Sequence, residues 1–234
     1  MQDKILDIVI VSYAKDDYCK ELTKNCISSL LLSEENSSDI FNIIVVESQP
    51  GFSWDNEPNI RTYEAPLPYG YHKFLNFGRK KGNSPWVALC NNDLEFKEGW
   101  FSKIIEASNK NPEVISFSPL CPMTQPLYGI FENTGLLKGY EIRKQLSGWC
   151  IVHKREIYDK IGDLDERFTH WYCDNDYAME MWKNGLKHAL VTDSVVVHHD
   201  KNIGKTTESV VKDYNQMYNM TSGSYPLFKE KWNL

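Results

Sequence analysis

The sequence predicts an α/β protein in which helices flank a Rossmann-like, mostly parallel central sheet. The runs Leu6–Tyr13 and Asn42–Glu47 are dominated by β-branched residues, a pattern typical of strands that are buried on both faces of a parallel sheet. Between them, residues 18–32 carry apolar side chains at helical spacing. A strand, a helix and a second strand in this order form a right-handed crossover, the basic unit of a parallel sheet.

The rest of the chain continues this alternation of strands and helices. Apolar runs predict strands at 60–63, 87–90, 114–118, 147–152 and 195–197. Helical spacing and end signals predict helices at 70–81, 98–109, 154–161 and up to Asn184-Gly185. Segment 119–146 is rich in Pro and Gly, so we expect mainly loops there, with one hairpin.

The composition limits the classes of protein. With 234 residues, 41% hydrophobic and 25% charged, the chain has the size and composition of one globular domain. A net charge of −6 argues against a general nucleic-acid binder, although it does not exclude a local basic patch. The six cysteines form no Cys-x-x-Cys pair, which predicts buried free thiols and a reducing, cytoplasmic location. We find no signal peptide and no apolar run that could span a bilayer, so any membrane contact is expected to be peripheral.

The strand at 87–90 ends in the polar triplet Asn91-Asn92-Asp93. Ligands of open α/β sheets bind at the carboxyl ends of the strands, and an aspartate there suits a hard cation such as Mg²⁺ or Mn²⁺. Taken alone, the triplet is more often an ordinary turn. The chain has no glycine before Gly51, so the dinucleotide fingerprint is missing, which argues against a role for NAD or FAD.

Three further features each have a structural and a functional interpretation. Asp174 falls in the first turn of a predicted helix, where it is either a helix-capping acid or a functional carboxylate. His198 ends the last predicted strand, where a histidine is more often structural than a metal ligand. The helix at 70–81 is basic, and its charges form either a solvated face or an electropositive wall for a diphosphate.

Taken together, these residues resemble the family 2 glycosyltransferases of GT-A fold, in the rhamnosyltransferase-like branch. The resemblance covers roughly residues 6–204, and its most specific match is Gly162–Phe168, which is close to the pattern Gly-Gly-Phe-Asp-Glu-x-Phe. The triplet that ends at Asp93 corresponds to the Asp-x-Asp motif, with an Asn in first position as in rhamnosyltransferase-like members. The chain departs from the family at Ala14, where an Asn is usual, and at Cys173, which replaces the Glu of the Glu-Asp catalytic motif.

The resemblance implies a role for each candidate residue. It makes Asp174 the catalytic base and Asp93 and His198 the ligands of a divalent metal, Mn²⁺ or Mg²⁺. It assigns the nucleotide-sugar donor to Ser12, Tyr13, Glu47, Asn76, Asn91 and Asn92. It assigns the acceptor to Trp149, Trp171 and Tyr172, although aromatic residues at such positions are otherwise core. It also divides the single domain 1–234 into a nucleotide-binding half at about 1–95, an acceptor-binding half at about 96–200 and a C-terminal lid at 201–234.

The implied activity is an inverting, metal-dependent transfer of a sugar in polysaccharide biosynthesis. The donor would be a UDP- or dTDP-linked sugar, and the acceptor a glycan or a lipid-linked oligosaccharide. One alternative is transfer to a modified DNA base, and another is an inactive nucleotide-sugar or carbohydrate-binding module. A nucleotidyltransferase is disfavoured because residues 12–18 contain no glycine for a phosphate-binding loop.

Overall fold

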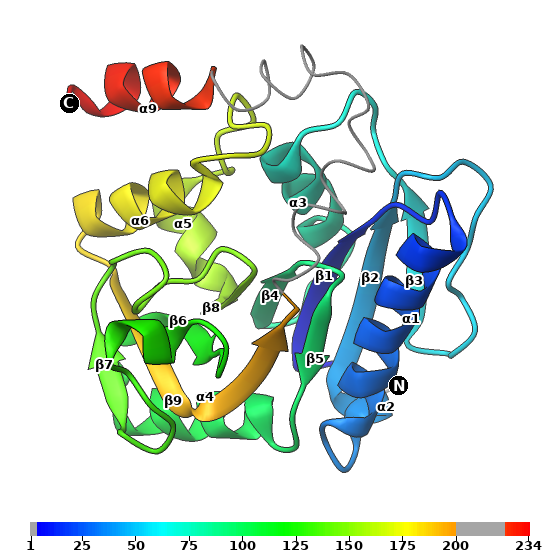
Figure 1. Ribbon diagram of the computed structural model, residues 1–234, viewed down its shortest axis with the longest axis horizontal. Helices are drawn as coiled ribbons and strands as arrows, with labels where there is room; N and C mark the ends of the chain where they lie inside the picture. The colour runs from blue at the N-terminus through cyan, green and yellow to red at the C-terminus, as the bar shows by residue number, and fades with distance from the viewer. Residues whose placement is uncertain (1–3, 200–222) are drawn as a thin grey trace.

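The computed structural model describes residues 4–199 and 223–234 (Figure 1). Its centre is a sheet with the strand order β3-β2-β1-β4-β8-β6-β9-β5, to which β7 adds by pairing with β9. The strands are β1 (Leu6–Ser12), β2 (Phe41–Glu47), β3 (Ile60–Glu64), β4 (Trp86–Cys90), β5 (Leu94–Phe96), β6 (Val114–Leu120), β7 (Leu136–Lys138), β8 (Cys150–Lys154) and β9 (Lys187–His198). The helices are α1 (Asp17–Leu32), α2 (Ser37–Ile40), α3 (Tyr71–Arg79), α4 (Trp100–Lys110), α5 (Tyr158–Ile161), α6 (Cys173–Lys183) and α9 (Ser224–Trp232), with 3-10 turns η1 (Gln125–Tyr128) and η2 (Arg155–Ile157). The predicted α/β class is confirmed.

The first half of the sheet is parallel and is covered on both faces. β1 pairs in parallel with β2 and β4, and β2 pairs in parallel with β3. Because alternate strand residues point to opposite faces, Ile8 and Ile10 pack with Leu30 of α1, while Val9 packs with Phe74 of α3. A Cβ at Gly78 of α3 would lie 2.4 Å from a methyl of Val9, so the absent side chain lets α3 lie directly on the sheet.

The second half of the sheet is mixed, which refines the expectation of a mostly parallel sheet. β8 runs antiparallel to both β4 and β6, and β9 runs antiparallel to β5 and β7 but parallel to β6. A buried apolar run does not encode the direction of its neighbour, so the sequence pattern predicted the strands but not these orientations.

Three elements differ from the sequence-based expectation. β5 follows Asp93 directly and was not predicted, and β9 begins at Lys187 instead of residue 195. The hairpin expected in 119–146 is absent among the described residues, since β7 pairs with β9. Residues 201–222 of the predicted lid lie outside the described residues. The rest of that segment contains α9. All six cysteines are free and buried, as predicted.

Candidate active site

Asp93 and His198 meet because β5 pairs with β9. In this antiparallel register Leu94 lies opposite His198, so the residue before β5 and the last residue of β9 share one edge of the sheet. Asp93 Oδ1 lies 3.4 Å from His198 Nε2. Two residues that stand far apart in the sequence, and that were predicted as a pair, are thus neighbours in the fold.

The chemistry of this pair fits a divalent cation. Asp93 and His198 are both buried, and Asp93 Oδ1 has no hydrogen-bond partner within residues 4–199 and 223–234. A buried carboxylate oxygen without a donor costs free energy, which a cation bound to it would offset. The His198 ring stacks on Trp149 with centroids 5.5 Å apart, which fixes the plane of the imidazole. Across the described part of the chain no cluster of three or more His, Cys, Asp or Glu side chains is suited to a metal. A cation at this pair would have two ligands from Asp93 and His198 and would need the others from a bound molecule or from water.

Ser12 and Asn92 meet through a residue that the sequence analysis did not identify. Thr23 of α1 shares a hydrogen bond of 3.0 Å with Ser12 Oγ and accepts one of 2.8 Å from Asn92 Nδ2. The ends of β1 and β4 are therefore tied together through α1. Tyr13 follows β1 directly and is partly buried beside this group.

Asn91 is held by Tyr71, a second residue that was missed. The Tyr71 hydroxyl lies 2.8 Å from Asn91 Oδ1 and 3.3 Å from the carbonyl oxygen of Gly148, and it can donate to either. Burial raises the pKa of Tyr71 well above its ordinary value, so the hydroxyl stays protonated and acts as a donor. Its only sequence signal was its place after Gly70, at the predicted start of a helix.

Asp174 lies in the first turn of α6 and packs against Gly148. A Cβ at residue 148 would lie 2.7 Å from Asp174 Cβ and 3.1 Å from Asp174 Oδ2, so a glycine is needed there. Asp174 Oδ1 accepts a hydrogen bond of 2.9 Å from the backbone of Asn175. Burial raises the pKa of Asp174, against the opposing charge of Arg143, and a carboxylate with a raised pKa is a better proton acceptor. Because Gly148 also touches Tyr71, this contact connects Asp174 with the end of β4.

The predicted acceptor residues occupy different environments. Trp149 is buried against His198, whereas Trp171 is 41% exposed. Tyr172 packs against Phe228 of α9 at a centroid distance of 5.2 Å. Cys173, which replaces the family's Glu, is buried and donates to the carbonyl oxygen of Phe168 over 3.4 Å. Of the three aromatic residues, Trp171 has the most surface for a sugar ring.

The side chain of Asn76, a predicted donor contact, is surrounded by hydrogen-bond partners of its own chain. Its amide nitrogen donates to Leu164 O at 2.8 Å and to Glu166 Oε1 at 3.1 Å. Its oxygen accepts from Leu164 N at 3.0 Å and from Arg79 Nε at 3.3 Å. An amide has two donor hydrogens and two acceptor sites, so these bonds use all of them and leave none for a nucleotide.

Glu47 is likewise engaged by its own chain. Its Oε1 accepts from the backbone of Ala14 at 2.8 Å and of Gln49 at 2.7 Å, and its Oε2 accepts from Trp54 Nε1 at 2.8 Å. With the side chain 1% exposed, Glu47 shapes the loops that follow β1 and β2 instead of presenting its carboxylate. The contact with the donor that the resemblance implies for Glu47 stays a prediction.

The basic residues of α3 and its end also bond to the protein itself. Lys73 donates to the carbonyl oxygens of Leu67 and Pro68 at 3.2 and 3.3 Å. Arg79 and Lys80 both pair with Asp163. The electropositive wall that the sequence left open is therefore not supported, and these charges attach the loop around Asp163 to α3. Lys205, which from the sequence could also add positive charge at the diphosphate, lies outside the described residues.

The chain has distant relatives among proteins of known name. No family model matches the chain. It is 20% identical to the N-acetylglucosaminyl-diphospho-decaprenol L-rhamnosyltransferase of Mycobacterium tuberculosis, over 83% of this chain and 76% of that protein. It is 19% identical to the O-antigen biosynthesis protein RfbC of Myxococcus xanthus over 57% of this chain, but this match spans 12% of RfbC.

A solved structure carries the same fold. The crystal structure of GalNAc-T7 with UDP, GalNAc and Mn²⁺ superposes with a TM-score of 0.64 at 13% identity, over 83% of this chain and 43% of that one. The predicted GT-A fold and the predicted resemblance to rhamnosyltransferase-like family 2 enzymes are confirmed. No helix within the described ranges is both long and apolar enough to cross a membrane.

Proposed function

We propose that this protein, a glycosyltransferase by its sequence relatives and its fold, moves a sugar from a UDP- or dTDP-linked donor to an acceptor hydroxyl with inversion and with a divalent metal. The observation that carries the proposal is the buried Asp93 Oδ1, which has no hydrogen-bond partner among the described residues and faces His198 Nε2 at 3.4 Å. The two groups lie where the strands end, the usual ligand edge of such a sheet.

Asp93 and His198 would hold the metal, and a ligand set of one oxygen and one nitrogen favours Mn²⁺ over Mg²⁺. When bound, the ion supplies positive charge next to the diphosphate leaving group. In support, the structural relative GalNAc-T7 was crystallised with UDP and Mn²⁺.

Ser12, Tyr13, Asn91 and Asn92 would bind the nucleotide part of the donor. Thr23 holds Ser12 and Asn92, and Tyr71 holds Asn91, so three of these side chains are fixed before the donor arrives. Such preorganisation lowers the entropy lost on binding. Tyr13 offers an aromatic ring for stacking on the base.

Asp174 would act as the general base. Its carboxylate takes the proton of the acceptor hydroxyl while that oxygen attacks the anomeric carbon of the donor sugar. The bond from the anomeric carbon to the diphosphate oxygen breaks on the opposite side, and its electrons leave with the diphosphate, which inverts the configuration. The sugar ring of the acceptor would contact Trp171, which is the most exposed of the three aromatic residues, and the smaller exposed surfaces of Trp149 and Tyr172.

The acceptor is proposed to be a glycan or a lipid-linked oligosaccharide, since the name of the mycobacterial relative describes a lipid-diphosphate-linked sugar acceptor. Transfer to a DNA base is not favoured, because the net charge of −6 offers no general attraction for phosphates. An inactive binding module is not favoured either, because Asp93 lies beside His198 and the half-buried carboxylate of Asp174 has a raised pKa, as the proposed reaction requires.

The test is release of nucleoside diphosphate from a panel of UDP- and dTDP-sugars, with Mn²⁺ and with EDTA. We expect turnover only with Mn²⁺. Asp174→Asn should lower kcat by about a thousandfold, within the usual range for a lost general base, while thermal stabilisation by UDP or dTDP with Mn²⁺ persists. Full activity of this variant would disprove the role of Asp174. Absence of turnover with every donor would favour the binding module.

The pH profile gives a further check on Asp174. The carboxylate accepts a proton only when ionised, so kcat should fall as the pH falls through its pKa. Because burial raises that pKa above the ordinary 3.8, the fall should begin at higher pH than for an exposed aspartate. A kcat that stays constant to below pH 4 would contradict the assignment.

A further inference from the structure

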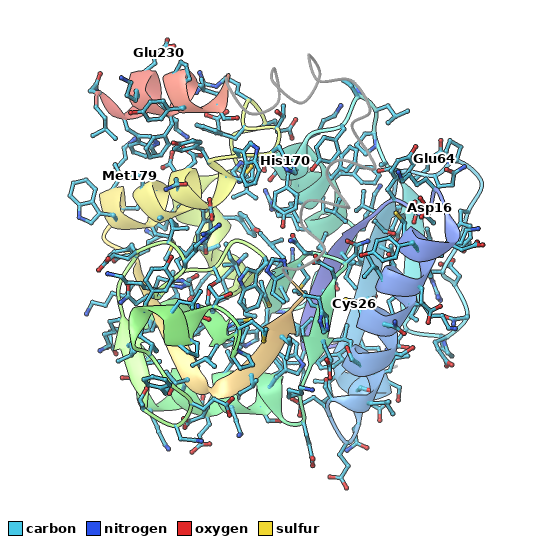
Figure 2. All side chains as sticks on the ribbon, viewed as in Figure 1. Asp16, Cys26, Glu64, His170, Met179 and Glu230 are labelled. Atoms are coloured by element: carbon cyan, nitrogen blue, oxygen red, sulfur yellow. The ribbon has the colours of Figure 1, made fainter. Side chains whose placement is uncertain are left out.

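The C-terminal helix α9 lies against α6, the helix that carries Asp174. Figure 2 shows the two helices side by side, with Glu230 marking α9 and Met179 marking α6. Phe228 of α9 is buried in a small apolar cluster with Phe168 and Cys173, and its ring lies 5.2 Å from that of Tyr172. α9 therefore covers the segment that leads into the first turn of α6.

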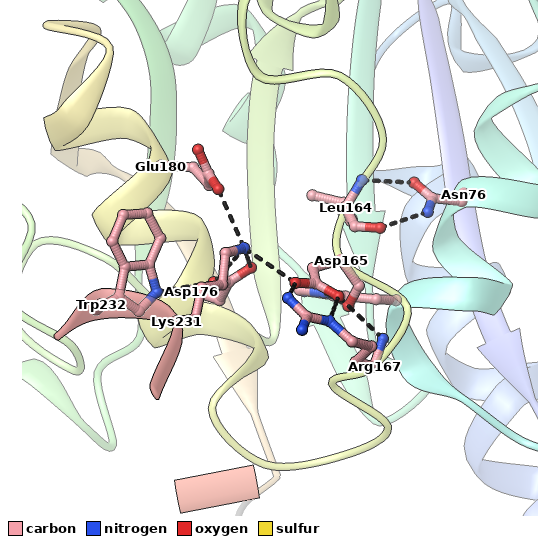
Figure 3. Close-up of polar contacts among 9 residues, drawn as sticks. Asn76, Leu164, Asp165, Arg167, Asp176, Glu180, Lys231 and Trp232 are labelled. Atoms are coloured by element: carbon pink, nitrogen blue, oxygen red, sulfur yellow. Dashed lines mark hydrogen bonds and ion pairs between the residues drawn. The ribbon is translucent and has the colours of Figure 1, made fainter. Parts of the chain in front are cut away.

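Lys231 and Trp232 of α9 hold a buried carboxylate of α6 (Figure 3). Lys231 Nζ lies 2.8 Å from Asp176 Oδ1, 3.1 Å from Glu180 Oε1 and 3.2 Å from Asp165 Oδ2. The indole of Trp232 donates to Asp176 Oδ1 over 3.0 Å. The Asp176 side chain is 2% exposed, so its partners on α9 replace the water that it has lost.

The charges of this cluster make Lys231 hard to replace. Burial raises the pKa of Asp176, whereas the bond to Lys231 lowers it. Burial also lowers the pKa of Lys231, but its bonds to Asp176, Glu180 and Asp165 raise it overall, so the ammonium stays charged. Removing this ammonium would leave three carboxylates close together, one of them buried. Within residues 4–199 and 223–234, only Asp165 would keep a second cation, in Arg167.

Asp176 is two residues from the candidate base, and its backbone closes the turn that contains Asp174. The N–H of Asp176 donates to the carbonyl oxygen of Tyr172 over 2.9 Å. Tyr172, the residue just before α6, has a left-handed conformation with φ of 64°, and its side chain does not cap the helix. This first turn thus lacks the usual side-chain cap, and the side chain of Asp176 attaches it to α9.

The carboxylates around Lys231 also include Asp165, whose loop packs against α3. Asp165 belongs to the loop that α3 binds, since His72 Nδ1 hydrogen-bonds to the carbonyl oxygen of Asp165 at 3.0 Å. The backbone of Tyr71 donates to Thr169 O over 2.8 Å, and its hydroxyl reaches Gly148, on which Asp174 packs. Lys231 therefore joins α6 to the loop that α3 binds, and Gly148 contacts both Tyr71 of α3 and Asp174 of α6.

We propose that α9 is a positioning element for the transfer reaction. Lys231 and Trp232 bind the side chain of Asp176 and thereby fix the first turn of α6. This turn then holds the carboxylate of Asp174 against Gly148. This inference rests on the proposed function of Asp174. Neither α9 residue touches the reacting atoms, so both act through Asp176. A shift of the base by about 1 Å is enough to lower a catalytic rate about a hundredfold.

The test compares Lys231→Met, which keeps the apolar stem but removes the charge, with Lys231→Arg, which keeps the charge. Lys231→Met should lower kcat of transfer by about 10- to 100-fold, with the KM for the donor and the thermal shift from UDP or dTDP with Mn²⁺ unchanged. Lys231→Arg should restore most of kcat. Lys229→Met removes an exposed lysine from the same helix and should behave as wild type. Amide hydrogen exchange at residues 173–177 should be faster in Lys231→Met than in both control proteins.

The outcomes separate this inference from the proposed function. A wild-type protein that transfers sugar, together with a Lys231→Met variant at wild-type kcat, would overturn the role of α9 alone. Equal loss of kcat and of nucleotide binding would show that Lys231 is merely structural and would also overturn it. If Lys231→Met does not fold, Trp232→Phe, which loses one N–H donor, takes the same test with an expected severalfold loss of kcat. Wild-type protein without transfer from any donor would refute the proposed function, and this inference with it.

Discussion

The two corners of the candidate site are built in different ways. The donor corner lies where β1, β4 and β9 end, and the sheet itself places its residues: the pairing of β5 with β9 brings Asp93 to His198. The base corner consists of Asp174 in the first turn of α6 and Gly148 in the segment before β8. Asp174 packs on Gly148, the carbonyl oxygen of Gly148 lies within hydrogen-bond distance of the Tyr71 hydroxyl, and α9 bonds to Asp176 in the same helical turn.

This difference teaches where each corner is sensitive. A sheet edge is rigid because many backbone hydrogen bonds define it, so single substitutions there remove a ligand without moving its neighbours. A corner assembled from three separate contacts depends on each of them. We therefore expect donor-corner variants to lose binding, and base-corner variants to lose rate at unchanged binding.

The largest effect is expected for Asp93→Asn, which breaks the donor corner. The amide has the same shape but no charge, so the metal would lose its only carboxylate ligand in this pair. We expect kcat/KM to fall about a thousandfold and the thermal shift from UDP or dTDP with Mn²⁺ to disappear. Asp174→Asn is the matched control, since it should keep that shift. Retention of the Mn²⁺-dependent shift by Asp93→Asn would mean that the metal does not bind here.

The sequence predicted the donor corner better than the base corner, for a physical reason. A buried parallel strand leaves an apolar run that ends in polar residues, so β1 and β4 and their terminal residues were visible, as were Asp93 and His198. What the pattern does not show is whether a buried polar side chain bonds to a ligand or to its own chain. Asn76 and Glu47 are examples, because both were predicted to contact the donor and both bond to their own chain in this structure.

The base corner depends on contacts between segments far apart in the sequence, and such contacts leave no periodic signal. Tyr71 and Gly148 are ordinary residues in the sequence, yet one hydrogen bond links them. Lys231 lies 55 residues after Asp176. The resemblance identified Asp174, but nothing in its own segment indicated that α9 holds the turn around it.

Three buried histidines, His72, His153 and His188, should make the stability of the protein depend on pH. All three lie outside strands β1 to β3. Burial lowers their pKa values from 6.5 to about 4, about 3 and about 4. They are neutral in the folded protein but take up protons when unfolded below pH 6.5, so stability should fall as the pH falls below 6.5. The slope is up to about 1.4 kcal/mol per pH unit and histidine, which gives up to about 4 kcal/mol at pH 5.5. Urea unfolding at pH 7.5 and 5.5 measures this, and equal stability at both would contradict it.

Gly148→Ala tests the contact that defines the base corner. The added methyl would lie 2.7 Å from Asp174 Cβ, so the carboxylate has to move. We expect kcat to fall about a hundredfold while the donor KM stays within a factor of two or so. Gly70→Ala is a control on the neighbouring helix, because among the described residues its methyl would meet only the Lys73 side chain, at 3.3 Å. If Gly148→Ala changed the donor KM as much as kcat, the two corners would not be separable at this residue.

The smallest effect is expected for Tyr71→Phe, which removes the hydroxyl between the two corners. The ring and its packing remain, but the single proton that the hydroxyl donates to Asn91 Oδ1 at 2.8 Å or to Gly148 O at 3.3 Å is lost. A lost hydrogen bond of this kind costs about 1 kcal/mol, which corresponds to a loss of about fivefold to tenfold. The hydroxyl contacts Asn91 in the donor corner and Gly148 in the base corner. We therefore expect a small loss of donor affinity together with a small loss of kcat. Tyr128→Phe, at an exposed tyrosine, should change neither. A Tyr71→Phe enzyme that lost only kcat would place Tyr71 in the base corner alone.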